Sequence, residues 1–595
     1  MRLRKGSDDS HASSDGPKHA RAGHASAGAV GMATIARPEG WQQLGALLLQ
    51  RNAISQHQLS EALLQQGASG KRIGALLVEL GALSEREVSE VLAAQLNLAL
   101  VDLGDQSPQP DAVAMLAESV ARAHLAIPMS RSGETLVIAV ADPTPELLAE
   151  LQASTKSLVT LVVAPGGDIR RAIDSSYRSL SGIDEFVEAF QKTSTKTKAV
   201  NLTSDSVTGD APIVQVVNKI ITQALRDRAS DIHLEPQDER LRVRFRIDGA
   251  LHDVLALPSE MAPALTSRLK IMAGMNIVER RRPQDGQIAM DVDGRAVDIR
   301  VATTGVIWGE KVVLRVLDKS RPLYKLNDLG MPADTHTAFS KMVRSPFGMV
   351  LCAGPTGSGK TTTLYATMSE INESQRNIMT IEDPVEYVFP SINQIQMNEQ
   401  AGLSFATGLK SILRQDPDVI LVGEIRDVDT ARIATQAALT GHFVLSSLHA
   451  TDAVAALHRF LDMGIESFLI ASSVLGVVGQ RLMRRTCDNC KKAYEPTPEE
   501  LAFYEESGGA SKSVFFKGAG CNFCSNTGFS DRIGVYELLK VTPEIKRLVV
   551  GWATQDELRR MAMKQGMRTL LDEAIALVEQ DLTTIPEVIR NIYTA

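Results

Sequence analysis

The sequence lacks the features that mark membrane-spanning, disulfide-stapled or nucleic-acid-binding proteins. No apolar run in its 595 residues approaches the about 18 residues of a membrane span, and residues 474–479 are apolar but far too few. Cysteine is scarce, with five in the whole chain. The net charge of −8 gives no support for nucleic acid as the main partner. A peripheral role at a membrane is the most that this composition suggests.

The first 38 residues are rich in Ser, Gly, Ala, His and charge. Three basic residues near the start resemble the first part of a signal peptide. The weak apolar run at 27–36 comes too late and contains too many small residues to complete one. We therefore expect either a disordered tail over 1–38 or a true start at Met32, and a cytoplasmic protein.

The strongest motif fits the phosphate-loop pattern. The apolar run 349–353 before it predicts a buried strand, and residues 362–369 after it predict a helix. Glycines let backbone N–H groups approach phosphate oxygens, and the helix N-terminus adds partial positive charge. We expect Lys360 to reach the terminal phosphates and Thr361 to ligate Mg²⁺. The predicted nucleotide-binding residues of this loop are Gly354, Pro355, Thr356, Gly357, Ser358, Gly359, Lys360, Thr361 and Thr362.

Two later strands end in carboxylates. Glu382, Asp383 and Glu386 follow the run 378–381, and Glu424 follows the run 419–422. Ligands of parallel sheets lie beyond the carboxyl ends of the strands, where such groups serve Mg²⁺ or orient water. Each alone is also compatible with a solvated turn, but two of them after one phosphate loop favour a catalytic site.

His442 and His449 bracket a predicted strand at 443–448. Their odd separation places them on opposite faces of a regular strand, so they are not expected to share a metal. Either one of them senses the terminal phosphate or both are structural.

Four of the cysteines form two Cys-x-x-Cys pairs. In a cytosolic chain this pattern favours one tetrahedral zinc ion over disulfides, with free thiols or a redox pair as the alternative. Four thiolates leave no open coordination position, so the role is structural. Cys352 is expected to be buried filler. The predicted zinc ligands are Cys487, Cys490, Cys521 and Cys524.

Arginines alternate along residues 241–249. Arg242, Arg244 and Arg246 fall on one face, which fits either a solvated edge strand or a surface that contacts phosphate. Residues 192–210 are rich in Thr, Ser and Lys and predict a flexible linker.

Residues 43–66 and 72–95 form an internal repeat with an offset of 29 positions. Apolar residues recur at helical spacing, and Ser55 and Ser84 occupy the places of helix N-caps. Each copy predicts a helical hairpin, which by itself need be no more than a packing unit. Residues 98–178 alternate strands and helices, including strands at 99–103, 135–140 and 159–164. Residues 543–550, 555–565, 570–578 and 583–593 predict helices near the C-terminus.

Taken together, these motifs resemble the secretion ATPases that power type II secretion and type IV pilus assembly, from residue 41 to the end. The phosphate loop resembles the family's Walker A motif, residues 380–386 its Asp box and residues 413–427 its Walker B segment. Residues 439–450 resemble its His box. The paired cysteines match the zinc-bearing subclass, which drives assembly or secretion rather than retraction.

The resemblance implies an α/β multidomain fold with a RecA-like P-loop ATPase core. A helical and α/β N-terminal domain and a small α/β (PAS-like) domain precede this core, and a zinc-bearing helical segment follows it. The expected division is a tail at 1–38, a regulatory or docking domain at 39–178, a linker at 179–210, the PAS-like domain at 211–322, the ATPase domain at 323–485, the zinc-binding segment at 486–535 and a helical subdomain at 536–595.

The resemblance also implies a homohexamer that uses ATP, Mg²⁺ and Zn²⁺ at the inner face of the cytoplasmic membrane. Its partners would be a polytopic platform protein and a cytoplasmic ring or membrane-recruiting subunit, with no nucleic acid. Glu424 would activate water, and His449 would contact the γ-phosphate region. The metal would be served by Glu382, Asp383 and Glu386. Arg244 and Arg246 are candidate arginine fingers.

The repeat resembles the duplicated cyclic di-GMP-binding motif of some of these ATPases. The second copy keeps Arg72, Gly74, Gly81 and Gln95. The first copy keeps Leu44, Gly45 and Gln66 but has Gln43 in place of Arg and Asn52 in place of Gly. Loss of the arginine removes a cation that pairs with phosphate, whereas Asn tolerates a left-handed turn. Cyclic di-GMP binding and a docking role alone both stay open.

Two other functions compete with a mechanochemical ATPase. A nucleotide-sensing scaffold would bind ATP but barely hydrolyse it, and the intact Lys360, Thr361 and Glu424 argue against that. A motor for DNA transfer finds no support in the net charge of −8. The sequence is equally compatible with a pilus and with a secretion pseudopilus.

Overall fold

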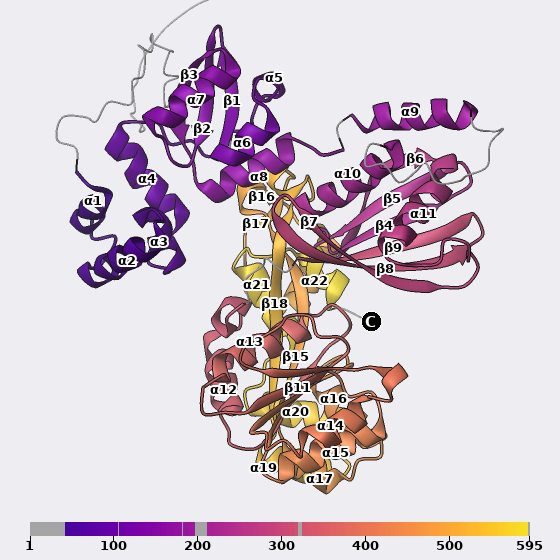
Figure 1. Cartoon of the computed structure of the whole chain (residues 1–595). Helices are drawn as coiled ribbons and strands as arrows, with labels where there is room; N and C mark the ends of the chain where they lie inside the picture. The colour runs from indigo at the N-terminus through magenta and orange to yellow at the C-terminus, as the bar shows by residue number, and fades with distance from the viewer. Residues whose placement is uncertain (1–41, 105, 181, 197–210, 319–323, 593–595) are drawn as a thin grey trace, which may run out of the picture. The chain divides into compact units, whose positions relative to one another are not determined.

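The computed structural model describes residues 42–104, 106–180, 182–196, 211–318 and 324–592 (Figure 1). The predicted tail at 1–38 lies outside them. Contacts divide the chain into two units. One contains the chain up to Val101 together with Ser130–Pro165, and the other contains Asp102–Met129 together with Gly166–Ala595. No helix in the described ranges is long and apolar enough to cross a membrane.

The first unit begins with the repeat, which forms two helical hairpins as predicted. Helices α1 (Leu44–Gln50) and α2 (Gln56–Ser69) make the first, and α3 (Ile73–Glu79) and α4 (Glu85–Leu96) make the second. Ser55 and Ser84 each form a capping box at the start of the second helix of a pair, which confirms both predicted N-caps. The apolar residues at helical spacing form one shared core, so the hairpins stabilise each other.

The same unit continues with β2 (Thr135–Val140), α7 (Pro145–Thr155) and β3 (Leu158–Val163), and β2 pairs with β3 in parallel. The strand predicted at 99–103 is wrong, because only Leu100 forms an isolated bridge, to Val163. Strand β1 (Ala126–Ser132) completes a sheet in the order β1-β2-β3.

The second unit includes the short helices α5 (Pro110–Val113), α6 (Glu118–His124) and α8 (Gly166–Ser176). Helix α9 (Ile183–Lys196) occupies part of the predicted linker 179–210, so that prediction is wrong for these residues. Ile183 is buried and Phe186 and Phe190 pack beside it against the core of the next domain, which explains the helix. The remainder of the linker, 197–210, lies outside the described residues.

The next domain is an antiparallel sheet of six strands in the order β6-β5-β4-β9-β8-β7. Strand β5 lies between two neighbours, so the edge-strand alternative for the arginine-bearing segment is wrong. Its alternation is real, because Leu241, Val243 and Phe245 are buried in the core. The elements are α10 (Pro212–Arg226), β4 (Asp231–Pro236), β5 (Arg240–Ile247), β6 (Ala250–Pro258), α11 (Ala262–Met272), β7 (Gln284–Val292), β8 (Arg295–Val306) and β9 (Gly309–Asp318).

A seven-stranded sheet in the order β12-β11-β13-β14-β10-β15-β18 forms the following domain. The strands from β12 to β15 run parallel, and helices cover both faces, so the strands read as nearly continuous apolar runs. The elements are α12 (Ala333–Val343), β10 (Gly348–Ala353), α13 (Lys360–Ile371), β11 (Ile378–Glu382), β12 (Asn393–Gln396), α14 (Phe405–Ile412), β13 (Val419–Val422), α15 (Val428–Leu439), β14 (Phe443–Leu448), α16 (Ala453–Asp462), α17 (Ser467–Ser473), β15 (Val474–Thr486) and β18 (Phe529–Lys540).

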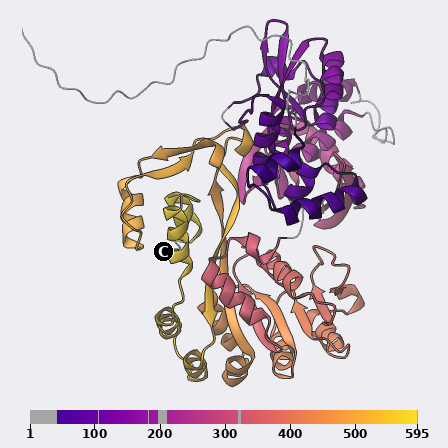
Figure 2. The same ribbon diagram turned by 90° about the vertical axis from the view of Figure 1, so that its left-hand side faces the viewer.

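Strand β18 was not predicted, and it changes the place of the cysteine-bearing segment. Strands β15 and β18 run side by side in antiparallel pairing (Figure 2). The segment between them, predicted to follow the ATPase domain, is instead an insertion between two strands of its sheet. It contains β16 (Lys491–Tyr494), α18 (Pro498–Glu506) and β17 (Phe515–Gly518).

Three helices predicted near the C-terminus are confirmed as α19 (Pro543–Val550), α20 (Gln555–Lys564) and α21 (Leu570–Glu579). The fourth helix predicted there, over 583–593, is confirmed as α22 (Ile585–Asn591). Apolar residues of α19 and α20 join the core of the seven-stranded sheet, whereas α21 and α22 pack on β15 and β18 beyond it. Helices α21 and α22 therefore pack on the same two strands that flank the inserted segment.

Candidate nucleotide site and metal centre

The phosphate loop connects the carboxyl end of β10 to the first turn of α13, as predicted. Gly357 and Gly359 have φ angles of +78° and +89°, a conformation that favours glycine. Gly359 also caps α13, so the loop presents its N–H groups where the helix N-terminus is positive. The loop therefore has the backbone geometry that phosphate binding requires.

Lys360 folds back over its own loop. Its Nζ donates to the carbonyl oxygens of Gly354 at 2.8 Å and Pro355 at 3.0 Å. Burial lowers the pKa of this amine, and the nearby Glu424 carboxylate opposes that shift. A phosphate group would offer the amine a stronger, charged partner than either carbonyl.

A residue that the sequence did not single out supports this loop from β15. The buried Gln480 donates its Nε2 to the carbonyl oxygen of Ser358 at 2.6 Å. An added Cβ at Gly359 would lie 3.0 Å from that same nitrogen. Because β15 is far from the loop in sequence, no local pattern indicated this contact.

Glu424 follows β13 and meets His449, which follows the neighbouring strand β14. Glu424 Oε1 lies 3.0 Å from His449 Nε2. Glu424 Oε2 accepts from Arg426 at 2.8 Å, and Arg426 also lies 3.5 Å from a carboxylate oxygen of Asp383. Burial is the main cause that lowers the pKa of His449, followed by the charge of Lys360. A carboxylate, an imidazole and the loop lysine thus belong to one electrostatic group.

The structure separates the two histidines. His442 lies before β14, and its Nδ1 is 3.0 Å from the carbonyl oxygen of Ala437, at the end of α15. His449 lies after β14 and meets Glu424. The two histidines therefore lie at opposite ends of β14, and His449 is the one that lies with Glu424.

Among the Asp-box carboxylates, Glu382 is 4% exposed and already hydrogen-bonded. Its oxygens accept from the Tyr365 hydroxyl, from Thr380 Oγ1 at 2.6 Å and from Gln394 Nε2 at 3.2 Å. Asp383 and Glu386 are therefore better placed than Glu382 to hold a metal ion. Glu386 is exposed, and the protein atoms packed around its carboxyl group raise its pKa by desolvation, a shift that the charge of Arg300 opposes.

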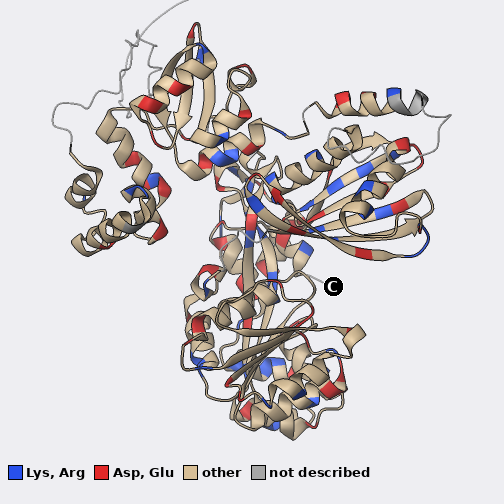
Figure 3. Ribbon diagram, viewed as in Figure 1, with Lys and Arg blue, Asp and Glu red and all other residues tan. Residues whose placement is uncertain are grey.

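The two candidate arginine fingers are paired with carboxylates on their own sheet. Arg244 donates to Glu235 at 2.8 Å, and Arg246 lies 3.5 Å from Asp231. Figure 3 shows basic and acidic residues side by side on these strands. The face is a charged network rather than a row of isolated cations.

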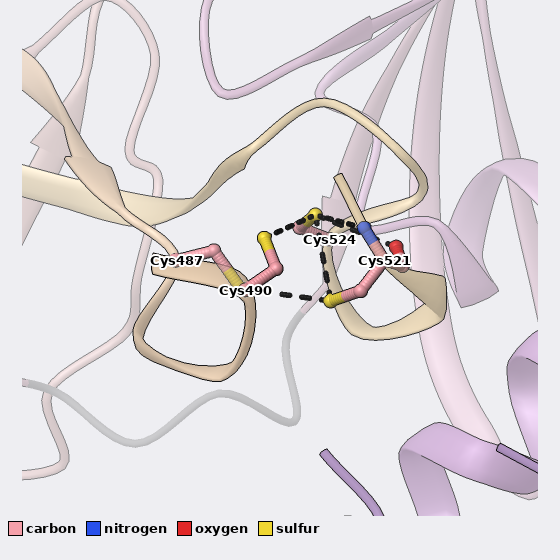
Figure 4. Close-up of side chains that lie close together, drawn as sticks. All are labelled: Cys487, Cys490, Cys521 and Cys524. Atoms are coloured by element: carbon pink, nitrogen blue, oxygen red, sulfur yellow. Dashed lines mark hydrogen bonds between the residues drawn. The ribbon is translucent and has the colours of Figure 1, made fainter. Parts of the chain in front are cut away.

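The four predicted zinc ligands come together, and their sulfur atoms lie within 4.8 Å of one another (Figure 4). Four sulfurs arranged tetrahedrally at about 2.3 Å from one zinc ion lie about 3.8 Å apart. The Cys487–Cys521 and Cys490–Cys524 sulfurs are separated by 3.8 Å and the Cys521–Cys524 sulfurs by 3.7 Å.

Backbone amides support the same centre. The N–H groups of Gly520 and Gly528 donate to the sulfurs of Cys490 and Cys524, each at 3.3 Å. Such donors stabilise thiolates, so the chemistry of the donor set fits zinc as well as the spacing does. Cys352 is fully buried in β10 and takes no part, as predicted.

In the repeat, the two glycines at equivalent positions pack closely against side chains of the facing helix. A Cβ at Gly45 would lie 2.8 Å from Leu59, and one at Gly74 would lie 2.9 Å from Val88. Gly81 and Asn52 both adopt the left-handed conformation, with φ of +69° and +55°, so the turn survives the substitution as expected.

The remaining residues of that motif have local partners. Arg72 forms an ion pair with Asp142, a carboxyl whose pKa burial raises. Gln95 Nε2 donates to the carbonyl oxygen of Gln42 at 2.6 Å, and Gln66 Nε2 donates to that of Lys71 at 3.2 Å. Leu44 packs at the edge of the hairpin core. Arg72, with a side chain 66% exposed, is accessible for an anionic ligand.

Two protein families match the chain. The family described as type II/IV secretion system protein matches residues 206–590, and the one described as MshEN domain matches residues 96–183. The second match therefore begins only at the end of the repeat.

Several known proteins are similar to it. The type IV pilus assembly ATPase PilB of Myxococcus xanthus is 40% identical over 560 residues, 92% of this chain and 98% of that protein. The type II secretion system ATPase E of Vibrio cholerae is 44% identical over 385 residues, 64% of this chain and 75% of that protein. A solved structure of MshE with cdg is 36% identical over 23% of this chain and 99% of that one, with a TM-score of 0.22.

Proposed function

Because the chain belongs to the type II/IV secretion system protein family, we propose that it is a motor ATPase for type IV pilus or type II secretion pseudopilus assembly. The observation that carries this proposal is the arrangement of the phosphate loop with Glu424 and His449 at the ends of neighbouring strands. These two side chains meet at 3.0 Å, where a terminal phosphate and its attacking water would lie beyond the sheet.

In the proposed reaction, Lys360 exchanges its two loop carbonyls for oxygens of the β- and γ-phosphates. Glu424 accepts the proton of the attacking water or orients it, and His449 contacts the γ-phosphate region. Arg426 holds the Glu424 carboxylate in place through its 2.8 Å contact. Arg244 and Arg246 become candidates to reach phosphate across a domain boundary, which requires them to leave Glu235 and Asp231.

We assign Mg²⁺ to Thr361 in the first turn of α13, together with Asp383 and Glu386. Hydroxyl and carboxylate oxygens are ligands that Mg²⁺ prefers. Desolvation raises the pKa of Glu386, so a cation nearby would favour its ionised form. When bound, the ion supplies positive charge to the phosphate oxygens.

We assign one structural zinc ion to the four cysteines of the inserted segment, because sulfur spacing and N–H donors both fit it. The ion would hold together a segment whose two ends lie on separate strands of the sheet. Four thiolates leave zinc no open position for substrate, so its contribution is to folding.

At the level of the assembly, we propose a homohexamer at the cytoplasmic face of the inner membrane. It would bind a polytopic platform protein and a cytoplasmic ring or recruiting subunit. The six-stranded domain would be PAS-like and act with the ATPase core. The repeat, with Arg72 as its main cation, would offer a site for cyclic di-GMP.

The function is tested by measuring steady-state ATP hydrolysis and oligomeric mass of the purified full chain. We expect hydrolysis and a hexameric mass. ATP binding without hydrolysis, in the hexamer and with the platform protein added, would instead identify a nucleotide-sensing scaffold.

A further inference from the structure

The turn that begins at His449 ends at a hydrogen bond to a buried carboxylate on β18. Glu537 is 4% exposed, and its Oε1 accepts the backbone N–H of Ala453 at 2.6 Å. Ala453 is the first residue of α16 and stands four positions after His449. The carboxylate therefore fixes the end of the short segment that begins at His449.

The second oxygen of the same carboxylate binds a different helix. Glu537 Oε2 accepts the N–H of Leu570 at 3.3 Å, and Leu570 is the first residue of α21. N–H groups in the first turn of a helix have no partner within the helix, and the helix dipole makes this end positive. One buried carboxylate thus satisfies the N-termini of two helices that are far apart in sequence.

Two arginines hold the rest of the turn. Arg481 on β15 donates to the carbonyl oxygen of Thr451 at 2.6 Å. Arg559 on α20 donates to Asp452 at 2.9 Å, and the other oxygen of Asp452 caps α16. Thr451 is thus bonded to β15, Asp452 to α20 and Ala453 to β18.

The backbone of β15 packs closely against Glu537 and the start of α16. Gly479 on β15 lies opposite Glu537 in the strand pairing. An added Cβ at Gly479 would lie 3.0 Å from the Ala453 nitrogen and 3.0 Å from Glu537 Oε1. The next residue, Gln480, holds the phosphate loop through Ser358. Neighbouring residues of one strand pair therefore contact both turns of the nucleotide site.

We propose that Glu537 is a positioning residue that couples the C-terminal helices to the nucleotide site by fixing the turn of His449. Glu537 is buried and acts through the turn. It sets where His449 lies relative to Glu424, and a displacement of α21 or β18 reaches His449 through it. This inference rests on the proposed function, since it concerns the control of that hydrolysis.

The test is Glu537→Gln in the full chain. The amide accepts one backbone N–H with its oxygen but presents an NH₂ group to the other, so one of the two helix contacts is lost at nearly constant shape. We expect kcat for ATP to fall by roughly 10-fold with KM unchanged, because a small misplacement of a catalytic group costs rate, up to about 100-fold for a shift of about 1 Å. Glu587→Gln is the matched control, because Glu587 is 3% exposed and binds Arg484 instead of the His449 turn.

A double-mutant cycle separates positioning from general damage to the fold. In a His449→Ala background, Glu537→Gln should reduce kcat by less than about 2-fold if it acts through His449. Arg481→Met, which removes the bond to Thr451, should show the same dependence and serves if Glu537→Gln fails to fold. The inference would be overturned if Glu537→Gln lowered kcat by the same factor in both backgrounds, or if Glu587→Gln lowered kcat as much as Glu537→Gln does. Either result would leave the ATPase function intact. Absent hydrolysis by the unmodified chain would overturn the proposed function itself, and this inference with it.

Discussion

At the scale of single residues, the lysine of the phosphate loop gives the simplest test of the nucleotide site. Lys360→Ala should abolish ATP turnover and leave the fold intact, because the amine bonds only to carbonyls of its own loop in this structure. Its task is to neutralise charge on the β- and γ-phosphates. Steady-state hydrolysis and a thermal melt measure the two effects, with the exposed Lys410→Ala as a control. Wild-type turnover in Lys360→Ala would refute the assignment.

Glu424→Gln should separate binding from hydrolysis. Loss of a group that acts on water typically costs about 10²–10⁴-fold in rate, whereas the amide keeps the size of the side chain. We expect ATP to bind normally and to be hydrolysed slowly, as measured by calorimetry and single-turnover kinetics. The exposed Asp429→Asn, on the helix that follows, should change neither quantity. A collapse of ATP affinity would mean that Glu424 has a binding or structural role.

The sequence predicted which residues belong to this site, but it did not predict which residues they would hydrogen-bond. It predicted the loop and the strand-end carboxylates, because each follows from a local pattern. It did not distinguish Glu382 from Asp383, since the hydrogen bonds that occupy Glu382 come from Tyr365 on α13 and Gln394 on β12. Such contacts depend on which elements become neighbours, and no spacing along the chain encodes that.

At the scale of elements, prediction succeeded where a segment's own pattern decides its structure. The C-terminal helices and the capped hairpins of the repeat are examples. Strand β18 was missed because its place is set by pairing with β15, which begins more than fifty residues earlier, over Gly476↔Lys540 to Thr486↔Phe529. Helix α9 was missed because the polar residues at its end suggested a linker. Phe186 and Phe190 pack against the apolar core of the six-stranded domain, which a local pattern does not reveal.

The inserted segment between β15 and β18 makes a prediction of its own. The protein should contain one zinc ion per chain, and Cys524→Ser should lose it, because three thiolates no longer complete the tetrahedral set. Elemental analysis of chelator-free protein measures this, and Cys352→Ala is the matched cysteine control. Nucleotide binding should persist in Cys524→Ser, since none of the four ligands lies in the phosphate loop. Freshly purified protein without zinc would contradict the assignment.

At the scale of the whole molecule, the chain combines a region that matches the secretion family with an N-terminal repeat that lies outside both family matches. The secretion family match spans residues 206–590, and the MshEN match begins at 96. Sequence patterns could locate the repeat because its two copies have similar residues at an offset of 29 positions. They could not say what its motif residues contact, and the structure shows that Gly45 and Gly74 pack closely against Leu59 and Val88.

The last prediction concerns what this repeat binds. Arg72 and Gln43 occupy equivalent N-cap positions, before α3 and α1, so each serves as the control for the other. If the full chain binds cyclic di-GMP in calorimetry, Arg72→Ala should weaken binding by about 10-fold or more, the usual effect of a lost charge-assisted hydrogen bond. Gln43→Ala should have little effect, because its copy of the motif has no cation there.

The structure sharpens that expectation. Arg72 is paired only with Asp142 among the contacts described for it, at an exposed position, so a phosphate can replace the carboxylate without unfolding either hairpin. Asp142→Asn should then leave binding unchanged or strengthen it, since it frees the arginine. Equal losses for Arg72→Ala and Gln43→Ala, or tight binding that ignores Arg72, would place the ligand on other residues. No binding at all would leave the hairpins as a docking domain, with Gly45 and Gly74 explained by packing.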